Sequence, residues 1–499
     1  MNRNENFTFY NRVSNDGAVL YRHKMFTFAM LDGEAEHLSS VLREHKVTER
    51  LKIGILIGNT PLFLCSLLAV AKLKAAGVLL STYSKKYEIE KHLYDTGVRI
   101  LISDNKSSAL IQSLSYHKNI LYSASDPIIG DIAIWRIEHQ GEDIFAQGHG
   151  DNWLDKEFIV QFTSGVSGTS KIVTRSYNNV IDEIINFSNT ISLTKGDVCI
   201  CPAPLFHAYG LINSFLASFY RGAKLVLMDK FVPNDLTNLI KRYRPTIFIG
   251  VPFMYNLLNK AFLPVGEDFS SLRLSFSAGA KLPKETAENF YKRFGVRINQ
   301  LYGSTETGVM ALNLYNNGTI DFDSVGKPVE GRIIKIVDND GHELPPYKKG
   351  EIKIKSPGTT KGYLNMPEIN KRVFRDGCFF TGDVGWMDPN NNLYITGRKS
   401  SFINVAGLKV DPSEIESVLL SNSSIRECAV VGVPGKSCGE IIKAYVTAEG
   451  KVSIKELAKY CRERLADYKV PREIEFIEEL PKSPTGKILR KYLIGEGKE

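Results

Sequence analysis

The stretch Phe162-Thr-Ser-Gly-Val-Ser-Gly-Thr-Ser-Lys-Ile-Val-Thr-Arg175 decides how the rest of the chain is interpreted. Gly165 and Gly168 allow backbone N–H groups to point inward at an anion, and Lys171 adds positive charge. Further donors come from the hydroxyl groups of Thr163, Ser164, Ser167, Thr169 and Ser170. Taken alone, the stretch fits two structures equally well: a phosphate-binding loop or a surface turn rich in small residues.

The apolar residues before this loop, Phe158 to Val160 and Phe162, predict a buried strand that opens into it. The loop is not of the Walker A type. Gly165 and Gly168 lie too close together for that motif, and Lys171 does not directly follow a glycine.

Length and composition favour an enzyme with anionic ligands. The 499 residues correspond to roughly three domain-sized units. The chain is 43% hydrophobic and 24% charged, which is typical of a globular protein. Its net charge is +8, but the basic residues are scattered and are not interleaved with aromatics, so we expect no nucleic-acid partner.

The cysteines and the apolar segments predict a cytoplasmic location. The seven cysteines form no CxxC pair, which favours free thiols in a reducing compartment. Residues 1–12 are polar and contain no apolar signal core. The longest apolar run, residues 62–80, is interrupted by Lys72 and Lys74, so we expect a buried or amphipathic helix and no membrane span.

Strand patterns alternate with helix patterns over the first 300 residues. Residues 52–57 read as a buried strand, an apolar helix is expected to run up to Gly77, and residues 98–103 read as the next strand. This alternation predicts a parallel α/β sheet. It recurs with expected strands at 197–200, 224–228, 246–251, 272–277 and 296–301, and an expected helix at 210–219.

The texture changes twice further along the chain. Beyond Asp321, short alternating segments such as 333–337 and 350–355 predict a β-rich subdomain. After Gly397 a mixed α/β pattern returns, with helices expected at 412–420 and 454–465 and strands at 428–433 and 443–447. We therefore expect an α/β protein with a large N-terminal domain of stacked α/β subdomains plus a β-rich subdomain, residues 1–398. A small mobile C-terminal α/β domain would follow, residues 399–499.

Four further segments accompany the opening loop: Tyr302-Gly-Ser-Thr-Glu-Thr307, Thr381-Gly-Asp383, Gly397-Arg398 and Pro484-Thr-Gly-Lys487. In this order and with these separations the chain resembles the adenylate-forming superfamily. That superfamily includes acyl- and aryl-CoA synthetases, luciferase and the adenylation domains of peptide synthetases. The pattern is closest to AMP-forming acyl-CoA ligases, and the resemblance runs from Phe26 to Arg490.

The resemblance implies a site for ATP. Tyr302, followed by Gly303, would stack on adenine, as the flat face of an aromatic ring suits. Asp383 would accept hydrogen bonds from the ribose hydroxyls, and Arg398 would lie near the ribose and phosphates. Gly279, Ala280 and Lys281 would wall the adenine side. The opening loop, through Thr163, Ser164, Gly165, Ser167, Gly168, Thr169 and Lys171, would hold the β- and γ-phosphates.

The resemblance also implies catalytic groups. Glu306 would hold Mg²⁺ and the Thr305 hydroxyl would meet the α-phosphate. Lys487 would offset charge on the attacking carboxylate and the α-phosphate while an acyl-adenylate forms. Because Lys487 serves only this first half-reaction, the C-terminal domain would then rotate about a hinge at Ser400 before a thiol attacks the adenylate.

Some positions depart from the superfamily pattern. Ser400 stands where Asp or Lys is usual, and Val166, Ser170 and Ile172 replace a usual Ser or Thr, Pro and Gly. We expect a looser phosphate loop, with one hydroxyl donor fewer.

The acid is expected to be largely apolar and to lack an α-amino group. His207 lies in Pro204-Leu-Phe-His-Ala-Tyr-Gly210, where acyl- and aryl-CoA ligases have a gate beside the acyl site, and no Asp follows to hold an ammonium. The pocket would be lined by His207, Tyr209, Val251, Phe253, Ser277, Gly279 and Tyr302. Aliphatic and aromatic acids both fit.

Coenzyme A is the expected thiol acceptor, because the segment 404–410 resembles the loop that lines the pantetheine channel of CoA ligases. Two alternatives stay open. The acceptor could be the phosphopantetheine of an acyl or aryl carrier protein, or the chain could bind nucleotide without catalysis. The sequence is compatible with either a monomer or a homodimer.

Overall fold

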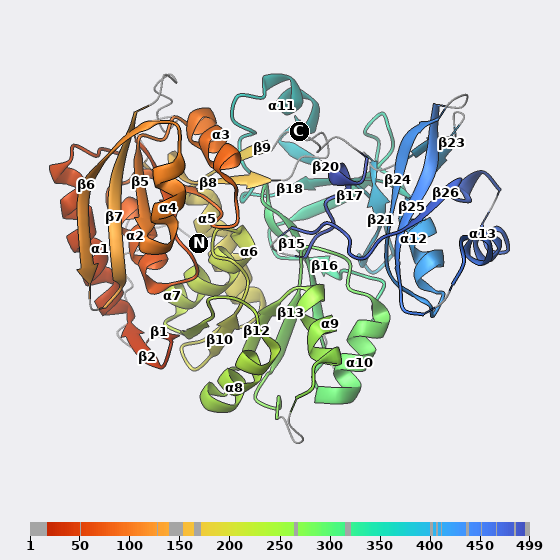
Figure 1. The fold of residues 1–499 in the computed structure, drawn as a ribbon, viewed down its shortest axis with the longest axis horizontal. Coiled ribbons are helices and arrows are strands. Elements are labelled where there is room, and N and C mark those ends of the chain that lie inside the picture. The colour runs from red at the N-terminus through yellow and green to blue at the C-terminus, as the bar shows by residue number, and fades with distance from the viewer. Residues whose placement is uncertain are drawn as a thin grey trace.

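The computed structural model describes residues 17–49, 51–126, 128–138, 153–163, 171–263, 268–314, 321–399, 403–405, 408–410, 412–435, 439–450, 452–465, 467–483 and 486–494. Four β-sheets organise these residues. Figure 1 shows the first two sheets in the body of the molecule, the third beside them, and the fourth with α12 and α13 at the far end of the long axis.

The first sheet has nine strands in the order β16-β15-β14-β13-β12-β10-β11-β1-β2. Pairing is parallel from β14 through to β1 and antiparallel at both edges. The strands are β1 (Ala18–Tyr21), β2 (Lys24–Thr27), β10 (Val198–Cys201), β11 (Lys224–Leu227), β12 (Ile247–Gly250), β13 (Leu274–Ser277), β14 (Asn299–Ser304), β15 (Gly308–Asn313) and β16 (Lys327–Pro328).

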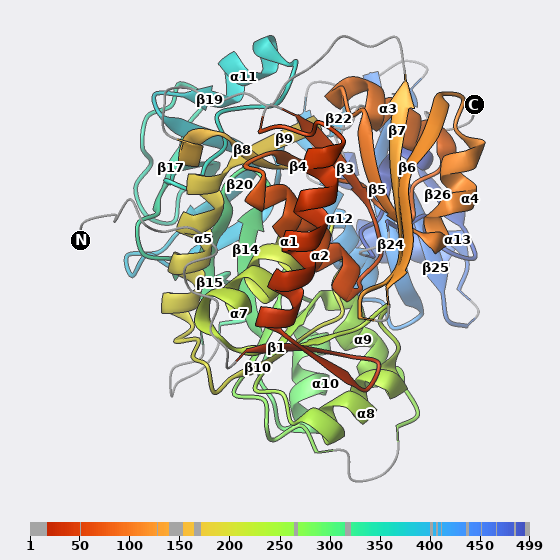
Figure 2. The ribbon, with the colours of Figure 1, turned by 90° about the vertical axis from the view of Figure 1, so that its left-hand side faces the viewer.

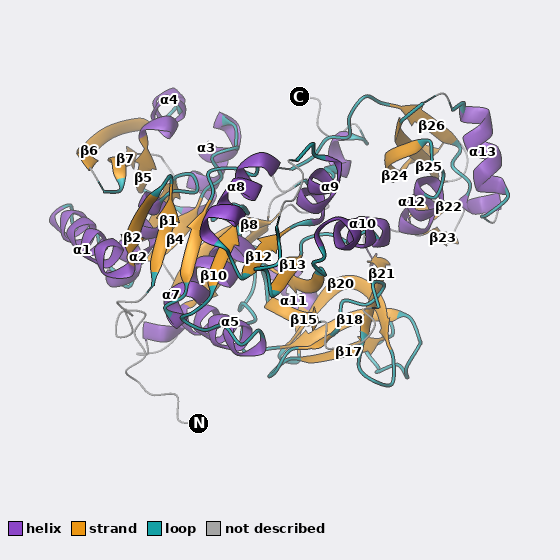
Figure 3. Ribbon diagram, turned by 90° about the horizontal axis from the view of Figure 1, so that it is seen from below, coloured by secondary structure: helices purple, strands orange, loops and turns teal. Residues whose placement is uncertain are grey.

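Helices cover both faces of this sheet, as its parallel strands require, because they are apolar on both sides. Ile200 and Phe248 pack with the helices α8 (Pro233–Tyr243), α9 (Pro252–Lys260) and α10 (Lys284–Phe294) on one face. Cys199 and Ile247 pack toward the other face, in a core shared with α5 (Tyr177–Thr190). Figure 3 shows α8, α9 and α10 on the opposite side of the sheet from α5.

The second sheet has seven strands in the order β6-β7-β5-β3-β4-β8-β9. The strands are β3 (Lys52–Leu56), β4 (Ala76–Leu79), β5 (Ile100–Asp104), β6 (His117–Asp126), β7 (Gly130–Glu138), β8 (Glu157–Thr163) and β9 (Lys171–Ser176). Its helices are α1 (Phe28–Glu44), α2 (Pro61–Lys72), α3 (Lys86–Thr96) and α4 (Asn105–Ser113), and α1 and α2 lie side by side (Figure 2).

Two expectations about this sheet need correction. The parallel α/β pattern holds for β5, β3, β4 and β8, but β6, β7 and β9 pair antiparallel, since hairpins close both edges. The apolar run 62–80 is not one helix up to Gly77. Helix α2 ends at Lys72, Lys74 has a left-handed backbone conformation with a φ of +55°, and strand β4 begins at Ala76.

The third sheet supports the predicted β-rich subdomain. It contains β17 (Ile333–Val337), β18 (Gly350–Lys355), β19 (Phe374–Arg375), β20 (Cys378–Met387) and β21 (Leu393–Arg398), with α11 (Pro367–Val373) leading into β19. Strands β20 and β21 pair antiparallel so that Asp383 lies opposite Arg398. Two predicted nucleotide residues therefore become neighbours through the register of one hairpin.

The fourth sheet belongs to the C-terminal part of the chain. It contains β22 (Ile403–Val405), β23 (Leu408–Val410), β24 (Ile425–Gly435), β25 (Gly439–Ala448) and β26 (Glu473–Phe476), covered by α12 (Pro412–Leu420) and α13 (Ile454–Arg462). Ile403, Ile415, Val430 and Leu457 share a core of their own. The division at residues 398 and 399 stays a prediction.

No helix within the described residues combines the length and the apolar character needed to cross a membrane.

Candidate active site

Strand order brings the predicted pocket residues together at the carboxyl ends of the parallel strands, along one edge of the first sheet. Val251 directly follows β12, Ser277 ends β13, and Tyr302 lies near the end of β14. His207 follows β10, which is paired with β12. The carboxyl ends of neighbouring parallel strands form a crevice in which α/β proteins bind ligands. We therefore place the candidate site at this edge.

The segment after β10 positions His207 and Tyr209. His207 precedes α6 (Ala208–Gly210) and a π-helical turn, Leu211–Leu216. The Tyr209 hydroxyl donates a hydrogen bond to the carbonyl oxygen of Gly250, 3.1 Å away, which ties the segment to β12. Burial lowers the pKa of His207 to about 4, so its imidazole is neutral at pH 7.

A pocket of about 190 Å³ opens at the same edge. Its walls come from the loops after β3, β4, β10, β11 and β12, and Val251 and Phe253 are the predicted acid-pocket residues among them. The complete lining is Gly58, Asn59, Thr82, Tyr83, Pro202, Pro204, Phe206, Asp229, Lys230, Phe231, Val251, Phe253 and Met254. The structure thus does not place His207, Tyr209, Ser277, Gly279 or Tyr302 in the wall of this pocket.

The predicted ribose and adenine residues meet between the first and third sheets. The Tyr302 hydroxyl donates to Oδ2 of Asp383 at 2.5 Å, and Nε of Arg398 lies 3.3 Å from Oδ1. The backbone N–H of Asp383 donates to the Thr381 hydroxyl at 3.0 Å. Burial raises the pKa of Asp383, and the positive charge of Arg398 opposes that shift. This carboxylate is therefore fixed from several sides while it keeps lone pairs for other donors.

Glu306 lies in the turn between β14 and β15, with Thr305 half-buried beside it. The Glu306 side chain accepts a hydrogen bond from the Tyr363 hydroxyl at 2.7 Å, and its carbonyl oxygen accepts one from the backbone N–H of Thr360. Lys171 begins β9, and its Nζ lies over the ring of Tyr363, 4.7 Å from the centroid. The carboxylate and the ammonium thus flank one aromatic side chain.

The phosphate-loop prediction is described only at its two ends. Thr163 ends β8 and pairs with Lys171 at the start of β9. Residues 164–170, which include Ser164, Gly165, Ser167, Gly168 and Thr169, lie outside the described residues, as does Ser400. Gly279 has a φ of +84°, and it is exposed together with Ala280 and Lys281.

Lys487 reaches this region from the C-terminal part of the chain. Backbone hydrogen bonds from Gly486 to Ser483 and from Ser483 to the Lys487 carbonyl close a tight turn. The turn rests on the body at Phe253, since a Cβ added to Gly486 would lie 2.9 Å from the Phe253 Cβ. Loss of water around the ammonium and the positive charge of Arg398 lower the pKa of Lys487, while Asp383 and Glu306 oppose that shift.

Sequence reasoning missed the residues that hold these groups in place. Tyr363 lies in a short segment without strand or helix periodicity, and nothing local connects it to Glu306. Arg175, fully buried in β9, pairs with Glu183 of α5 and donates to the carbonyl oxygen of Gly358 at 3.2 Å. The one available signal is a pair of opposite charges, Arg175 and Glu183, eight residues apart in the sequence.

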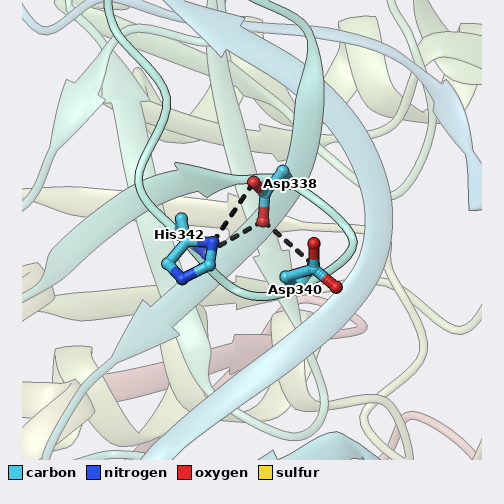
Figure 4. A group of neighbouring side chains, drawn as sticks. All are labelled: Asp338, Asp340 and His342. Atoms are coloured by element: carbon cyan, nitrogen blue, oxygen red, sulfur yellow. Dashed lines mark hydrogen bonds and ion pairs between the residues drawn. The ribbon is translucent and has the colours of Figure 1, made fainter.

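A cluster elsewhere in the described residues has the composition of a cation site. Asp338, Asp340 and His342 lie in the turn after β17, where one Asp338 oxygen accepts the backbone N–H groups of Asp340 and His342 at 2.9 Å (Figure 4). These bonds stabilise the turn itself. The cluster is at the surface of the third sheet and contains none of the predicted site residues.

The predicted site residues therefore come from a layered α/β body and, in the case of Lys487, from the C-terminal part of the chain. The chain belongs to the AMP-binding enzyme family, whose model matches residues 8–364. The model of the AMP-binding enzyme C-terminal domain matches residues 414–487. The resemblance inferred from the five sequence segments is thereby confirmed.

Characterised relatives share most of the chain. A long-chain-fatty-acid–CoA ligase from Bacillus subtilis is 30% identical, over 98% of this chain and 93% of the relative. A 2-succinylbenzoate–CoA ligase from the same organism is 29% identical, over 95% and 94%. The structure of an o-succinylbenzoate coenzyme A synthetase from Bacillus subtilis with ATP and a magnesium ion is similar with a TM-score of 0.80 and 28% identity. The structural match covers 95% of this chain and 96% of the synthetase chain. The predicted fold class, a large α/β body with a small C-terminal domain, is confirmed.

Proposed function

We propose that this protein is an AMP-forming acid–thiol ligase that joins a carboxylic acid to coenzyme A at the expense of ATP. The observation that carries the proposal is the hydrogen-bonded group of Tyr302, Asp383 and Arg398 in the body, together with the turn that carries Lys487, which rests on the body at Phe253. The relatives that cover nearly the whole chain are CoA ligases, which supports the same reaction class.

In the first half-reaction the acid's carboxylate attacks the α-phosphate of ATP in line, and pyrophosphate leaves. Lys487 offsets the negative charge that gathers between the two reactants, and the Thr305 hydroxyl donates to the α-phosphate. Glu306 offers the carboxylate oxygens that Mg²⁺ prefers, so the donor set fits this ion. Bound Mg²⁺ would neutralise charge on the departing pyrophosphate.

Asp383 orients the nucleotide by accepting the ribose hydroxyls, and the positive charge of Arg398 favours the ionised form of that carboxylate against the effect of burial on its pKa. Tyr302 presents its ring to the adenine while its hydroxyl is held by Asp383. The residues after β13, namely Gly279, Ala280 and Lys281, lie exposed at the same edge and would border the base. Thr163, Lys171 and the loop between them would hold the β- and γ-phosphates.

In the second half-reaction a thiol attacks the acyl-adenylate carbonyl, the acyl–oxygen bond breaks and AMP leaves. We propose that the C-terminal part first turns about Ser400, which would remove Lys487 from the site. The contact of Gly486 with Phe253 is one that this rotation would break. The thiol would come from coenzyme A.

The acid is proposed to be largely apolar, aliphatic or aromatic. Neutral His207 and the buried residues Val251 and Ser277 line the edge where its carbonyl end would lie. No buried carboxylate among them would hold an ammonium group, which disfavours amino acids.

The direct test is exchange of labelled pyrophosphate into ATP with a panel of fatty and aryl acids, followed by thioester formation with coenzyme A. At least one acid should support both reactions, and Lys487→Ala should lower the exchange about 10²–10³-fold. Lys455→Ala, a change of an exposed lysine on α13, is the matched control. If no acid supports exchange and Lys487→Ala behaves like the control, the proposed function is wrong.

A further inference from the structure

We propose that Tyr363 is a positioning residue. It fixes the metal-binding carboxylate of Glu306 and the phosphate-binding ammonium of Lys171 relative to each other. Its hydroxyl donates a hydrogen bond to Oε1 of Glu306 at 2.7 Å. Its ring faces Lys171, whose Nζ lies 4.7 Å from the ring centroid. The inference rests on the proposed function, because it concerns how that site holds ATP and its metal ion.

Tyr363 is rigidly placed. Its side chain is buried and lies against the ring of Phe374, with centroids 5.5 Å apart. Its backbone is fixed by Asn370, whose side chain accepts from the Tyr363 N–H and donates to the Tyr363 carbonyl oxygen, both at 2.8 Å. A buried side chain with a fixed backbone has few rotamers, so the hydroxyl stays where it is.

The segment around Tyr363 is also attached to the phosphate-loop strand. Tyr363 forms an antiparallel bridge with Val173, and the backbone N–H of Leu364 donates to the Ile172 carbonyl at 2.9 Å. Thr360 extends the attachment in both directions, because its backbone N–H donates to the Glu306 carbonyl and its hydroxyl to the Thr174 carbonyl. This short segment therefore lies between β9 and the Glu306 turn.

The hydrogen bond to Glu306 orients the carboxylate. A phenol is protonated at neutral pH, so the Tyr363 hydroxyl is the donor and the Glu306 carboxylate the acceptor of this bond. A bond from one hydroxyl uses one of the roughly four lone-pair positions of a carboxylate. The remaining positions can accept other partners while the side chain cannot rotate away.

The ring of Tyr363 serves the second group. An ammonium over an aromatic face is attracted by the ring's negative quadrupole, and this attraction grows as water is excluded. Lys171 lies over the ring while Glu306 is bonded to the hydroxyl, so the two charged groups contact different parts of one side chain. One side chain thus fixes the separation of a carboxylate for the cation and an ammonium for the polyphosphate.

Two substitutions separate the functions of the hydroxyl and the ring. Tyr363→Phe removes the bond to Glu306 and keeps the ring under Lys171, whereas Tyr363→Leu removes both. Tyr394→Phe is the matched control, because the Tyr394 hydroxyl also donates to a carboxylate, Asp321, at 2.7 Å. Asp321 and Tyr394 lie outside the predicted site.

The readouts are the affinity for Mn²⁺ in the presence of a non-hydrolysable ATP analogue, measured by electron paramagnetic resonance, and the affinity for the analogue alone, measured by calorimetry. A hydrogen bond to a charged group is worth about tenfold or more in an equilibrium constant. Tyr363→Phe should weaken Mn²⁺ binding about tenfold and leave metal-free analogue binding unchanged. Tyr363→Leu should weaken both.

The proposal is overturned if Tyr363→Phe binds Mn²⁺ as the unaltered protein does. It is also overturned if Tyr363→Phe and Tyr394→Phe weaken Mn²⁺ binding equally, or if Tyr363→Phe weakens metal-free analogue binding as much as Mn²⁺ binding. The Phe variant alone decides the matter if the Leu variant does not fold. Failure of the proposed function would instead appear in the unaltered protein, as absence of exchange with every acid, and would leave the Mn²⁺ comparison interpretable.

Discussion

Substituting Gly486 by alanine tests whether the docked position of the Lys487 turn is the one that forms the adenylate. Gly486 has a φ of +77°, and an added Cβ would lie 2.9 Å from Cβ and 3.1 Å from Cγ of Phe253. Carbon atoms pack best at about 3.5–4.0 Å, so the methyl group cannot be accommodated while the turn rests on Phe253. Once the turn leaves the body, the methyl group no longer meets Phe253.

The size of the effect follows from the cost of overpacking, about 1–3 kcal/mol. The left-handed backbone conformation at residue 486 is unfavourable for alanine. If the turn keeps its shape, this free-energy cost is the same in the docked and undocked positions and does not change the equilibrium between them. At about 1.4 kcal/mol per tenfold change, the ratio of docked to undocked protein should fall about 5- to 150-fold, and the adenylation rate should fall with it. Transfer of the acyl group from a supplied acyl-adenylate to coenzyme A should not slow.

The assay compares pyrophosphate exchange with thioester formation from synthetic acyl-adenylate. Gly450→Ala is the control, because Gly450 also has a positive φ, +110°, but has open space around it. Repeating Gly486→Ala in a Phe253→Ala background should remove most of its effect. Equal losses from the alanine changes at 486 and 450, or an undiminished loss in that background, would refute the reasoning.

Three further predictions concern charge. Lys487→Ala should lower pyrophosphate exchange about 10²–10³-fold, as removal of one transition-state donor does, and leave transfer from supplied acyl-adenylate intact; equal loss of both rates would contradict this. Glu183→Gln should lower the free energy of unfolding in urea by about 3–5 kcal/mol, because Arg175 stays buried without its ionic partner. A combined change of both residues to apolar ones should cost less, and a larger cost would argue against the ion pair as the cause. His92 is stacked on Phe162 at 3.7 Å, and burial lowers its pKa from 6.5 to about 4. Because the unfolded chain then binds the extra proton, stability should be full above pH 6.5 and fall by up to about 3 kcal/mol as the pH drops toward 4. The urea midpoint of His92→Phe should lack this loss.

Strand ends were the part of the site that the sequence could predict. Val251, Ser277 and Tyr302 each end or directly follow a segment that the sequence predicts as a strand, at 246–251, 272–277 and 296–301. Once strands are parallel and adjacent, their ends must converge. Their convergence at one end of the first sheet thus followed from local pattern and topology together, although only Val251 of the three lines the pocket.

The contacts between these residues could not be predicted in the same way. Tyr302 and Asp383 were both assigned to the nucleotide, but their 2.5 Å hydrogen bond joins residues 81 positions apart in different sheets. Such an approach depends on how the third sheet packs on the first, and no local period encodes it. The same is true of Tyr363, which is 57 residues from Glu306.

The sheet edges were missed for a different reason. Strand β6 carries mostly exposed or half-exposed residues. The alternation of apolar and polar residues in the β6–β7 hairpin is therefore weak in the sequence. Strand β7 is buried on both faces, with Ile132 and Ile134 in one core and Ile137 in another, whereas its partner β6 at the edge of the sheet is exposed or half-exposed. Patterns tuned to strands buried on both faces do not detect such an edge.

The π-helical turn Leu211–Leu216 has a consequence for sequence alignment. A π-turn is the result of one residue more than an α-helix would hold over the same length. Deleting that residue would restore a regular helix and rotate everything before it by about 100°, including His207 and Tyr209. Chain length in this helix is therefore tied to the direction in which those two side chains point. An alignment of homologues that differ in this turn should open a one-residue gap between positions 211 and 216, even where the flanking residues match.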